Sequence, residues 1–116
     1  MARLLVHVNT GTADPTRAAL GLFVARAALE EGHAVDVFVA GDGVVWLRPE
    51  TREAATGVGT GSIAEHWAAL VAGGARLFGS GLSSKARGVT PPDGVEMGSP
   101  ARLVQLTLEA DRVLTY

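Results

Sequence analysis

The chain contains no cysteine. This absence excludes a disulfide framework, a zinc site built on thiolates and catalysis by a cysteine nucleophile. Charged residues are also sparse, at 19% of the 116 residues, and the formal net charge is −2. A nucleic-acid-binding surface needs a basic face or stripe. We therefore expect no nucleic-acid partner.

Long apolar runs are missing as well. A helix that crosses a bilayer needs about 20 consecutive apolar residues, and no stretch of this sequence approaches that length. The apolar run near the amino end, Leu4–Val8, is too short for a signal peptide and precedes no small-residue cleavage site. We expect a cytoplasmic protein without a membrane partner, with one domain over residues 1–116.

Strand and helix signals alternate along the chain. Short apolar runs rich in branched residues predict buried strands, and a capping residue followed by proline predicts the start of a helix. The predicted strands are Leu4–Val8, Ala34–Ala40, Ala75–Phe78, Val95–Met97 and Val113–Tyr116. The predicted helices begin at Asp14-Pro15, at the capping box Ser62–Glu65 and at Ser99-Pro100. Strand, helix and strand in close succession form a parallel βαβ unit, so the pattern indicates a doubly wound α/β fold.

Helical spacing predicts which side of each helix is buried. The predicted apolar face of the first helix consists of Leu20, Phe23, Val24, Ala27 and Ala28. That of the second consists of Ile63, Trp67, Leu70 and Val71, and that of the last of Leu103, Val104, Leu106 and Leu108.

The segment from Gly41 to Gly61 shows no such period. Val44–Leu47 fits either a short helix or a buried loop, and the glycines at 57, 59 and 61 predict a mobile connection. This segment either closes over a pocket or packs against a neighbouring subunit. Trp46 and Trp67 are expected in the core or at an interface.

No motif predicts a cofactor or a metal. The glycines at 57, 59 and 61 have the wrong spacing for a dinucleotide site, and no phosphate-binding loop is present. The three histidines are scattered, without the spacing of metal ligands. His33 is expected at a helix end, where a cation favours the dipole, and His66 on a solvated helix side. His7, in a central strand, is a core residue and a weak catalytic candidate.

Small polar residues follow the predicted strand Ala75–Phe78. The carboxyl ends of parallel strands are where ligands collect in such folds. Ser80, Gly81 and Ser83 stand there, with Lys85 and Arg87 just beyond. The stretch fits a helix start capped by serines with two solvated cations. It fits equally a pocket for a small anionic ligand at a helix N-terminus.

Three stretches together resemble the DsrE/DsrF-like proteins of sulfur-relay pathways. They are Leu77–Val89, Asp93–Gly98 and Thr107–Tyr116, and Asn9-Thr10-Gly11 after the first strand fits the same pattern. The resemblance implies a flavodoxin-like three-layer fold with a five-stranded, mainly parallel sheet, assembled as homotrimers or homohexamers. It also implies a cysteine after the third strand that carries sulfur as a persulfide. Aligned on Arg87-Gly88, that cysteine falls at Ser80, and a second one found in some members falls at Ser83.

A serine hydroxyl cannot hold a persulfide, because the thiolate is both nucleophile and sulfur carrier. The sequence therefore predicts a non-catalytic DsrE-like subunit that binds a small ligand or a partner protein and needs no cofactor. Its expected ligand-binding residues are Asn9, Gly11, Gly41, Ser80, Gly81, Ser83, Lys85 and Arg87.

Two enzymatic alternatives stay open. In the first, the protein takes part in sulfur transfer by using a partner's cysteine, with Ser80 orienting the persulfide. In the second, Ser80 and His7 form a small-molecule hydrolase, which requires the two side chains within about 3 Å of each other.

Overall fold

Five parallel strands form the central sheet, in the order β6-β5-β2-β1-β7. The structure is a computed structural model that describes every residue from Met1 to Tyr116. The strands are β1 (Arg3–Val8), β2 (Ala34–Val39), β5 (Arg76–Ser80), β6 (Val95–Gly98) and β7 (Arg112–Thr115). The predicted α/β fold is thus confirmed, with a sheet that is parallel throughout.

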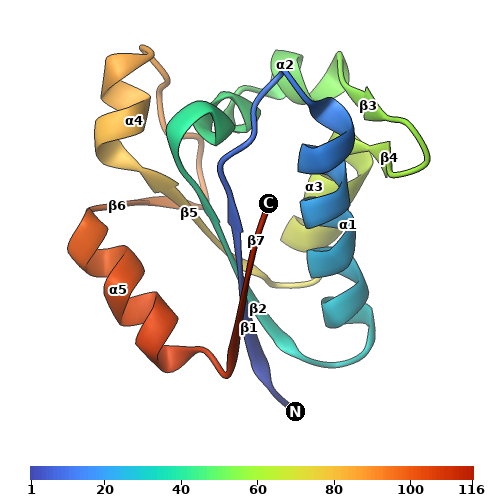
Figure 1. Cartoon of the computed structure of the whole chain (residues 1–116), viewed down its shortest axis with the longest axis vertical. Coiled ribbons are helices and arrows are strands. Elements are labelled where there is room, and N and C mark those ends of the chain that lie inside the picture. The colour runs from blue at the N-terminus through green and yellow to red at the C-terminus, as the bar shows by residue number, and fades with distance from the viewer.

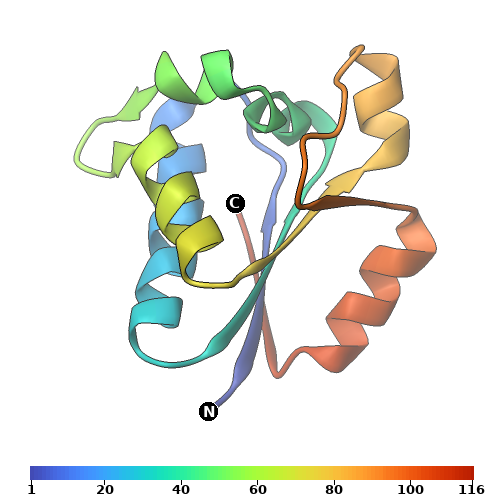
Figure 2. The same ribbon diagram turned by 180° about the vertical axis from the view of Figure 1, so that it is seen from behind.

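Helices cover both faces of this sheet (Figure 1). The helices α1 (Pro15–Glu30) and α3 (Ile63–Ala72) pack side by side on one face, as the reverse view also shows (Figure 2). The chain crosses the sheet in one direction from β1 to β6 and then returns to β7 beside β1. Because parallel connections are right-handed, that reversal places α5 (Pro100–Glu109) on the opposite face.

The predicted helix starts are confirmed. Asp14, Ser62 and Ser99 each accept a hydrogen bond from the backbone N–H three residues on, at 3.0, 3.2 and 3.2 Å. Pro15 and Pro100 occupy the first helical position, where the missing N–H costs nothing.

The core has two parts, one on each face of the sheet. The larger part joins β1, β2 and β5 to α1 and α3. The smaller part lies between the sheet and α5 and consists of Leu5, Phe38, Phe78 and, from α5 itself, Leu106. The strand β2 is buried on both faces, because it lies at the centre of the sheet.

The predicted apolar face of α1 is mostly wrong, since only Ala28 of its five residues is buried. Leu20 and Phe23 are 39% and 45% exposed. The residues that α1 buries are mostly small: Ala18, Ala19, Gly21, Leu22, Ala25 and Ala28. Small side chains let the helix approach its neighbours closely. The face of α1 that packs against the rest of the protein is therefore the one with small side chains, and the larger side chains at the predicted positions stay partly exposed.

The predicted face of the last helix is also only partly confirmed. In α5, Leu106 is fully buried and Leu103 half-buried, but Val104 and Leu108 are 57% and 80% exposed. In α3, Ile63, Trp67 and Leu70 are buried as predicted, whereas Val71 is 55% exposed. These exposed apolar side chains belong to surfaces that the single chain leaves uncovered.

The prediction of a mobile connection after Gly41 is wrong. The segment folds into the 3-10 helix η1 (Gly41–Leu47), the helix α2 (Pro49–Glu53) and the antiparallel pair β3 (Thr56–Gly57) and β4 (Gly61–Ser62). Trp46 anchors it, because this side chain is fully buried and its Nε1 donates to the Thr10 carbonyl at 2.7 Å. Trp46 and Trp67 are both core residues of the chain. None of the helices has the length and apolar character that crossing a membrane requires.

Candidate functional site

Ser80 and Ser83 lie together at the carboxyl edge of the sheet. Ser80 is the last residue of β5 and the N-cap of the short helix α4 (Gly81–Ala86), and its Oγ accepts from the Ser83 N–H at 3.1 Å. The Oγ of Ser83 in turn accepts from the Gly41 N–H at 2.9 Å. The two hydroxyls therefore join β5, α4 and the start of η1.

The two cationic residues of this stretch, Lys85 and Arg87, differ in whether they form an ion pair. The Arg87 guanidinium forms an ion pair with Asp42, Nη2 to Oδ1, at 2.8 Å and donates to the Ser83 carbonyl at 3.2 Å. Asp42 is thus the counterion of Arg87 at the start of η1. Lys85 is exposed and forms no ion pair within 4.0 Å, so it carries an unpaired positive charge at this edge.

A cavity of about 420 Å³ lies beside Lys85, between α4 and the start of α5. Its lining includes Gly81 and Lys85 from the predicted set, together with Leu82, Met97 and Ser99. Ser80 and Ser83 do not line it. The ligand-binding positions predicted from the sequence are therefore divided between this cavity and the contacts that hold η1.

Gly11 and Gly41 belong to those contacts, whereas Asn9 pairs with the last residue of the chain. The Asn9 N–H donates to the Tyr116 carbonyl at 2.8 Å, which ties the end of β1 to the end of the chain. A Cβ on Gly11 would meet the Asp42 carbonyl oxygen at 2.7 Å, and Gly41 has φ +54°. Glycine is required at both positions, because one has no room for a side chain and the other has a left-handed backbone.

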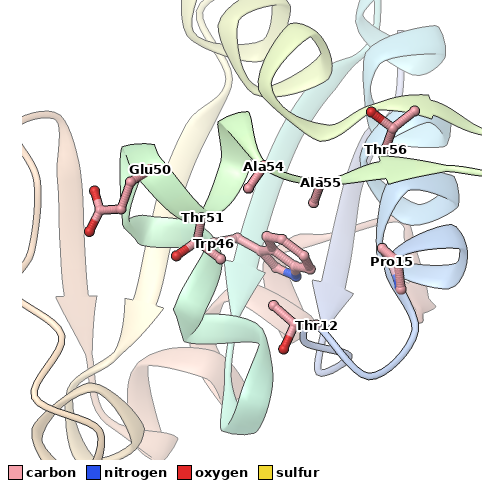
Figure 3. Close-up of a pocket in the computed structure, with 8 residues that line it drawn as sticks. All are labelled: Thr12, Pro15, Trp46, Glu50, Thr51, Ala54, Ala55 and Thr56. Carbon is pink, nitrogen blue, oxygen red and sulfur yellow. The ribbon is translucent and has the colours of Figure 1, made fainter.

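A second cavity at the same edge, of about 450 Å³, has no counterpart in the sequence prediction (Figure 3). Side chains from the loop after β1, from η1, from α2 and from β3 surround it, with Trp46 at the centre of the view. Thr12, Thr51 and Thr56 line it, and their hydroxyls form no hydrogen bond with another group of the protein. Because the segment after Gly41 was expected to be mobile, no sequence signal pointed here.

His7 lies on β1 between Val6 and Val8, with its ring edge-on to Phe38 at 5.9 Å between ring centroids. Its Nε2 is buried and has no hydrogen-bond partner, while the Ser80 hydroxyl is bonded to Ser83. No hydrogen bond joins His7 and Ser80. Burial lowers the pKa of His7 below its ordinary value.

The other two histidines have structural contacts. The predicted solvated position of His66 is wrong: it is buried, with its Nε2 2.7 Å from the Thr60 carbonyl and its ring stacked on Phe23 at 4.8 Å. His33 follows the end of α1, and its Nδ1 accepts from the Ala2 N–H at 3.0 Å. This hydrogen bond joins the ring to the backbone near the amino end of the chain. No group of three or more His, Cys, Asp or Glu side chains is placed to hold a metal ion.

Comparison with known proteins gives one family. The model of the DsrE/DsrF-like family matches residues 2–116. Eight chains of solved structures match significantly. One is the crystal structure of the YchN protein from E. coli, with 27% sequence identity and a TM-score of 0.83 over 100% of both chains. No significant match was found among curated proteins.

Proposed function

The chain belongs to the DsrE/DsrF-like family, and from this premise we propose that it is a non-catalytic subunit related to sulfur-relay proteins. In this role it binds a small ligand or a partner protein at the carboxyl edge of its sheet. We further propose that it acts in the cytoplasm, as the family resemblance implies.

One observation supports the non-catalytic role above all others. The chain has no cysteine. Serines stand at the two positions aligned with the family cysteines, and both hydroxyls accept hydrogen bonds, Ser80 from the Ser83 N–H and Ser83 from the Gly41 N–H. A nucleophilic serine needs an adjacent base. The one histidine proposed for that task, His7, makes no hydrogen bond with Ser80.

The proposed ligand is a small anion held beside Lys85. Three features support this choice: Lys85 has no ion pair, it lines a cavity of about 420 Å³, and Gly81 of the predicted set lines the same cavity. The remaining predicted positions, Asn9, Gly11, Gly41, Ser80, Ser83 and Arg87, are proposed to shape the edge around it. Arg87 contributes less charge than Lys85, because Asp42 neutralises it.

A thermal-shift series with sulfite, thiosulfate and phosphate tests this proposal. A ligand present at a hundred times its dissociation constant stabilises the folded state by about 2.7 kcal/mol. Lys85→Met should remove the shift, whereas Arg17→Met should retain it, because Arg17 is equally exposed and its side chain has no ion pair. Equal shifts in both variants would contradict binding at Lys85, and no shift with any of the three anions would contradict the anion proposal.

A second candidate function is sulfur transfer with a partner's cysteine. It is favoured by the position of Ser80 at the end of β5, where its side chain is half-buried and reachable from the edge. Incubation of wild type and Ser80→Cys with polysulfide, followed by mass spectrometry of the intact protein, separates the two functions. Wild type should gain no sulfur under either function. A gain by Ser80→Cys would show that the edge still accepts a persulfide, whereas no gain would remove the relay alternative.

We propose that the protein self-associates, as a homotrimer or a homohexamer. Leu82 on α4, Val104 and Leu108 on α5 and Val113 on β7 are exposed apolar side chains. Both helices lie on the same side of the sheet (Figure 1). Apolar side chains gathered on one side of a small protein are typical of a protein–protein surface.

A further inference from the structure

A cavity of about 590 Å³ lies away from the two at the carboxyl edge. It is bounded by α3, by the end of α2 and by the segment that leads into β6. Seven of its eleven lining residues are hydrophobic. Trp67, Val71, Leu77 and Val95 are among them, and Arg52 is its one positive charge.

Arg52 is held in place but has no counterion. Its Nη1 donates to the Trp46 carbonyl at 2.8 Å, and its Cζ lies 4.8 Å from the centroid of the Trp67 ring. No carboxylate lies within 4.0 Å of it, although Glu50 and Glu53 belong to the same short helix. A guanidinium carries five N–H donors, so the Nε and Nη2 groups remain free of protein acceptors.

The environment of Arg52 favours an incoming negative charge. Burial is the main influence on its pKa and lowers it, while the charges of Glu53 and Glu50 act in the opposite direction. A cation that has lost part of its hydration without gaining a partner is stabilised by a carboxylate, especially when two parallel N–H···O bonds form. The apolar walls offer no comparable contact to a hydrated inorganic anion.

We propose that this cavity, here named the Arg52 cavity, binds a small monocarboxylate with an apolar body. The carboxylate accepts from the two free donor groups of Arg52. The apolar body packs against Trp67, Val71 and Leu77. Asp93, which also lines the cavity, disfavours a second carboxylate on the ligand, so a dicarboxylate of the same length binds more weakly.

Hexanoate is the first probe, compared with 1-hexanol and with adipate by isothermal titration calorimetry on the wild-type protein. Hexanoate should bind saturably. Hexanol lacks the charge and should bind at least about tenfold more weakly, since a hydrogen-bonded charge contributes that much or more to an affinity. Adipate should also be weaker, because its second carboxylate meets Asp93. Equal binding of hexanoate and hexanol would overturn the proposal.

Two variants and a matched control locate the binding. Arg52→Gln should lose hexanoate binding by about tenfold or more. Because Arg52 also supports the Trp46 carbonyl, Val71→Asp gives a second test. It places a negative charge on the cavity wall at a position 55% exposed and disturbs little packing. Val58→Asp, at 85% exposure on the turn between β3 and β4, adds the same charge outside the cavity and should leave binding unchanged.

Unaltered binding in both Arg52→Gln and Val71→Asp would refute the site. Failure of hexanoate to bind the wild-type protein, even at a dilution that dissociates any oligomer, would also refute the site. Lys85→Met should not alter hexanoate binding, because Lys85 lines a different cavity. The Arg52 cavity and the proposed anion site therefore succeed or fail separately.

Discussion

Asp36 shows how one charged side chain is accommodated in the core. It is fully buried on β2, and three donor groups surround it: Arg3 Nη1 at 3.0 Å, Arg76 Nε at 2.6 Å and Arg76 Nη2 at 2.7 Å. The hydrogen bond to Asp36 is the main cause that raises the pKa of Arg76. Both arginines are partly exposed, so the carboxylate is the member of this cluster that has left water completely.

Replacing Asp36 with alanine should therefore be strongly destabilising. Breaking a buried ion pair typically costs about 3–5 kcal/mol, which is an upper bound here because the two guanidinium groups that lose their acceptor are partly exposed. Urea denaturation followed by circular dichroism measures the loss. Glu30→Ala is the control, because its pair with Arg26 is largely exposed and should contribute less than about 1 kcal/mol. Equal losses in the two variants would contradict the role of burial.

His7 should make stability depend on pH. Its folded pKa is lowered by burial, so between that pKa and about 6.5 the unfolded chain binds more protons than the folded one. The free energy of unfolding should therefore fall as pH decreases through this window and be unaffected by His7 above it. In His7→Phe, which replaces an unpartnered nitrogen with an apolar ring, this fall should shrink. Denaturation curves at pH 7.5 and 5 measure it, and an identical fall in both proteins would contradict the prediction.

The sequence predicts single residues well where the interaction is local. Asp14, Ser62 and Ser99 cap their helices as expected, since a cap needs only a residue three positions on. Asp36 and His66 were not recognised, because their partners come from distant segments. Asp36 was also missed because the alternation along β2 resembles that of a strand with one solvated face. In the structure, α5 and its apolar residues cover that face.

Among the elements, η1 depends on a close backbone contact. Gly43 passes so near to β1 that a Cβ there would meet the Val8 carbonyl oxygen at 2.2 Å. The contact involves backbone on both sides, so neither partner can move aside as a flexible side chain would. The position of η1, and of the Trp46 that it carries, therefore requires glycine at 43.

Gly43→Ala should displace η1 and cost about 1–3 kcal/mol, the usual range for an overpacked site. Gly81→Ala is the matched control, because the nearest atom to its Cβ would be the Gly98 carbonyl oxygen at 3.8 Å. That substitution should change stability by less than about 1 kcal/mol, in the stabilising direction. Thermal denaturation measures both. A stable Gly43→Ala protein with unchanged Trp46 fluorescence would contradict the close contact.

The strands were predicted more accurately than the connection around η1. Buried parallel strands are short apolar runs, and both ends of each predicted strand lie within two residues of the ends of an observed strand. The segment after Gly41 has no such run. Its order comes from Trp46 and the Gly43 contact, which bind it to β1 and the loop after it. Arg52 adds a hydrogen bond within the segment and a contact with the Trp67 ring. Helix faces were harder to predict, because α1 buries alanines and leaves Phe23 to stack on His66.

For the molecule as a whole, the distribution of exposed apolar side chains bears on assembly. Leu82, Val104, Leu108 and Val113 belong to α4, α5 and β7, and the α5 side has the smaller of the two core parts. The sequence could not separate these residues from core residues, since helical spacing alone does not show how much of a helix its own chain covers. A second copy that covers this side would account for them.

Leu108→Glu tests whether that side is covered in solution. Leu108 is 80% exposed in the single chain, so in a monomer the substitution should change stability by no more than about 0.5 kcal/mol. In a homotrimer or homohexamer that buries α5, the new carboxylate would be desolvated without a partner, and light scattering should report a smaller mass than for wild type. Val58→Glu, at 85% exposure on the turn between β3 and β4, introduces the same charge on another side and should leave the mass unchanged. Monomeric wild type would contradict self-association. An oligomer unaffected by Leu108→Glu would place the contact on a different face. The next residues to test would then be the partly exposed Leu20 and Phe23 of α1.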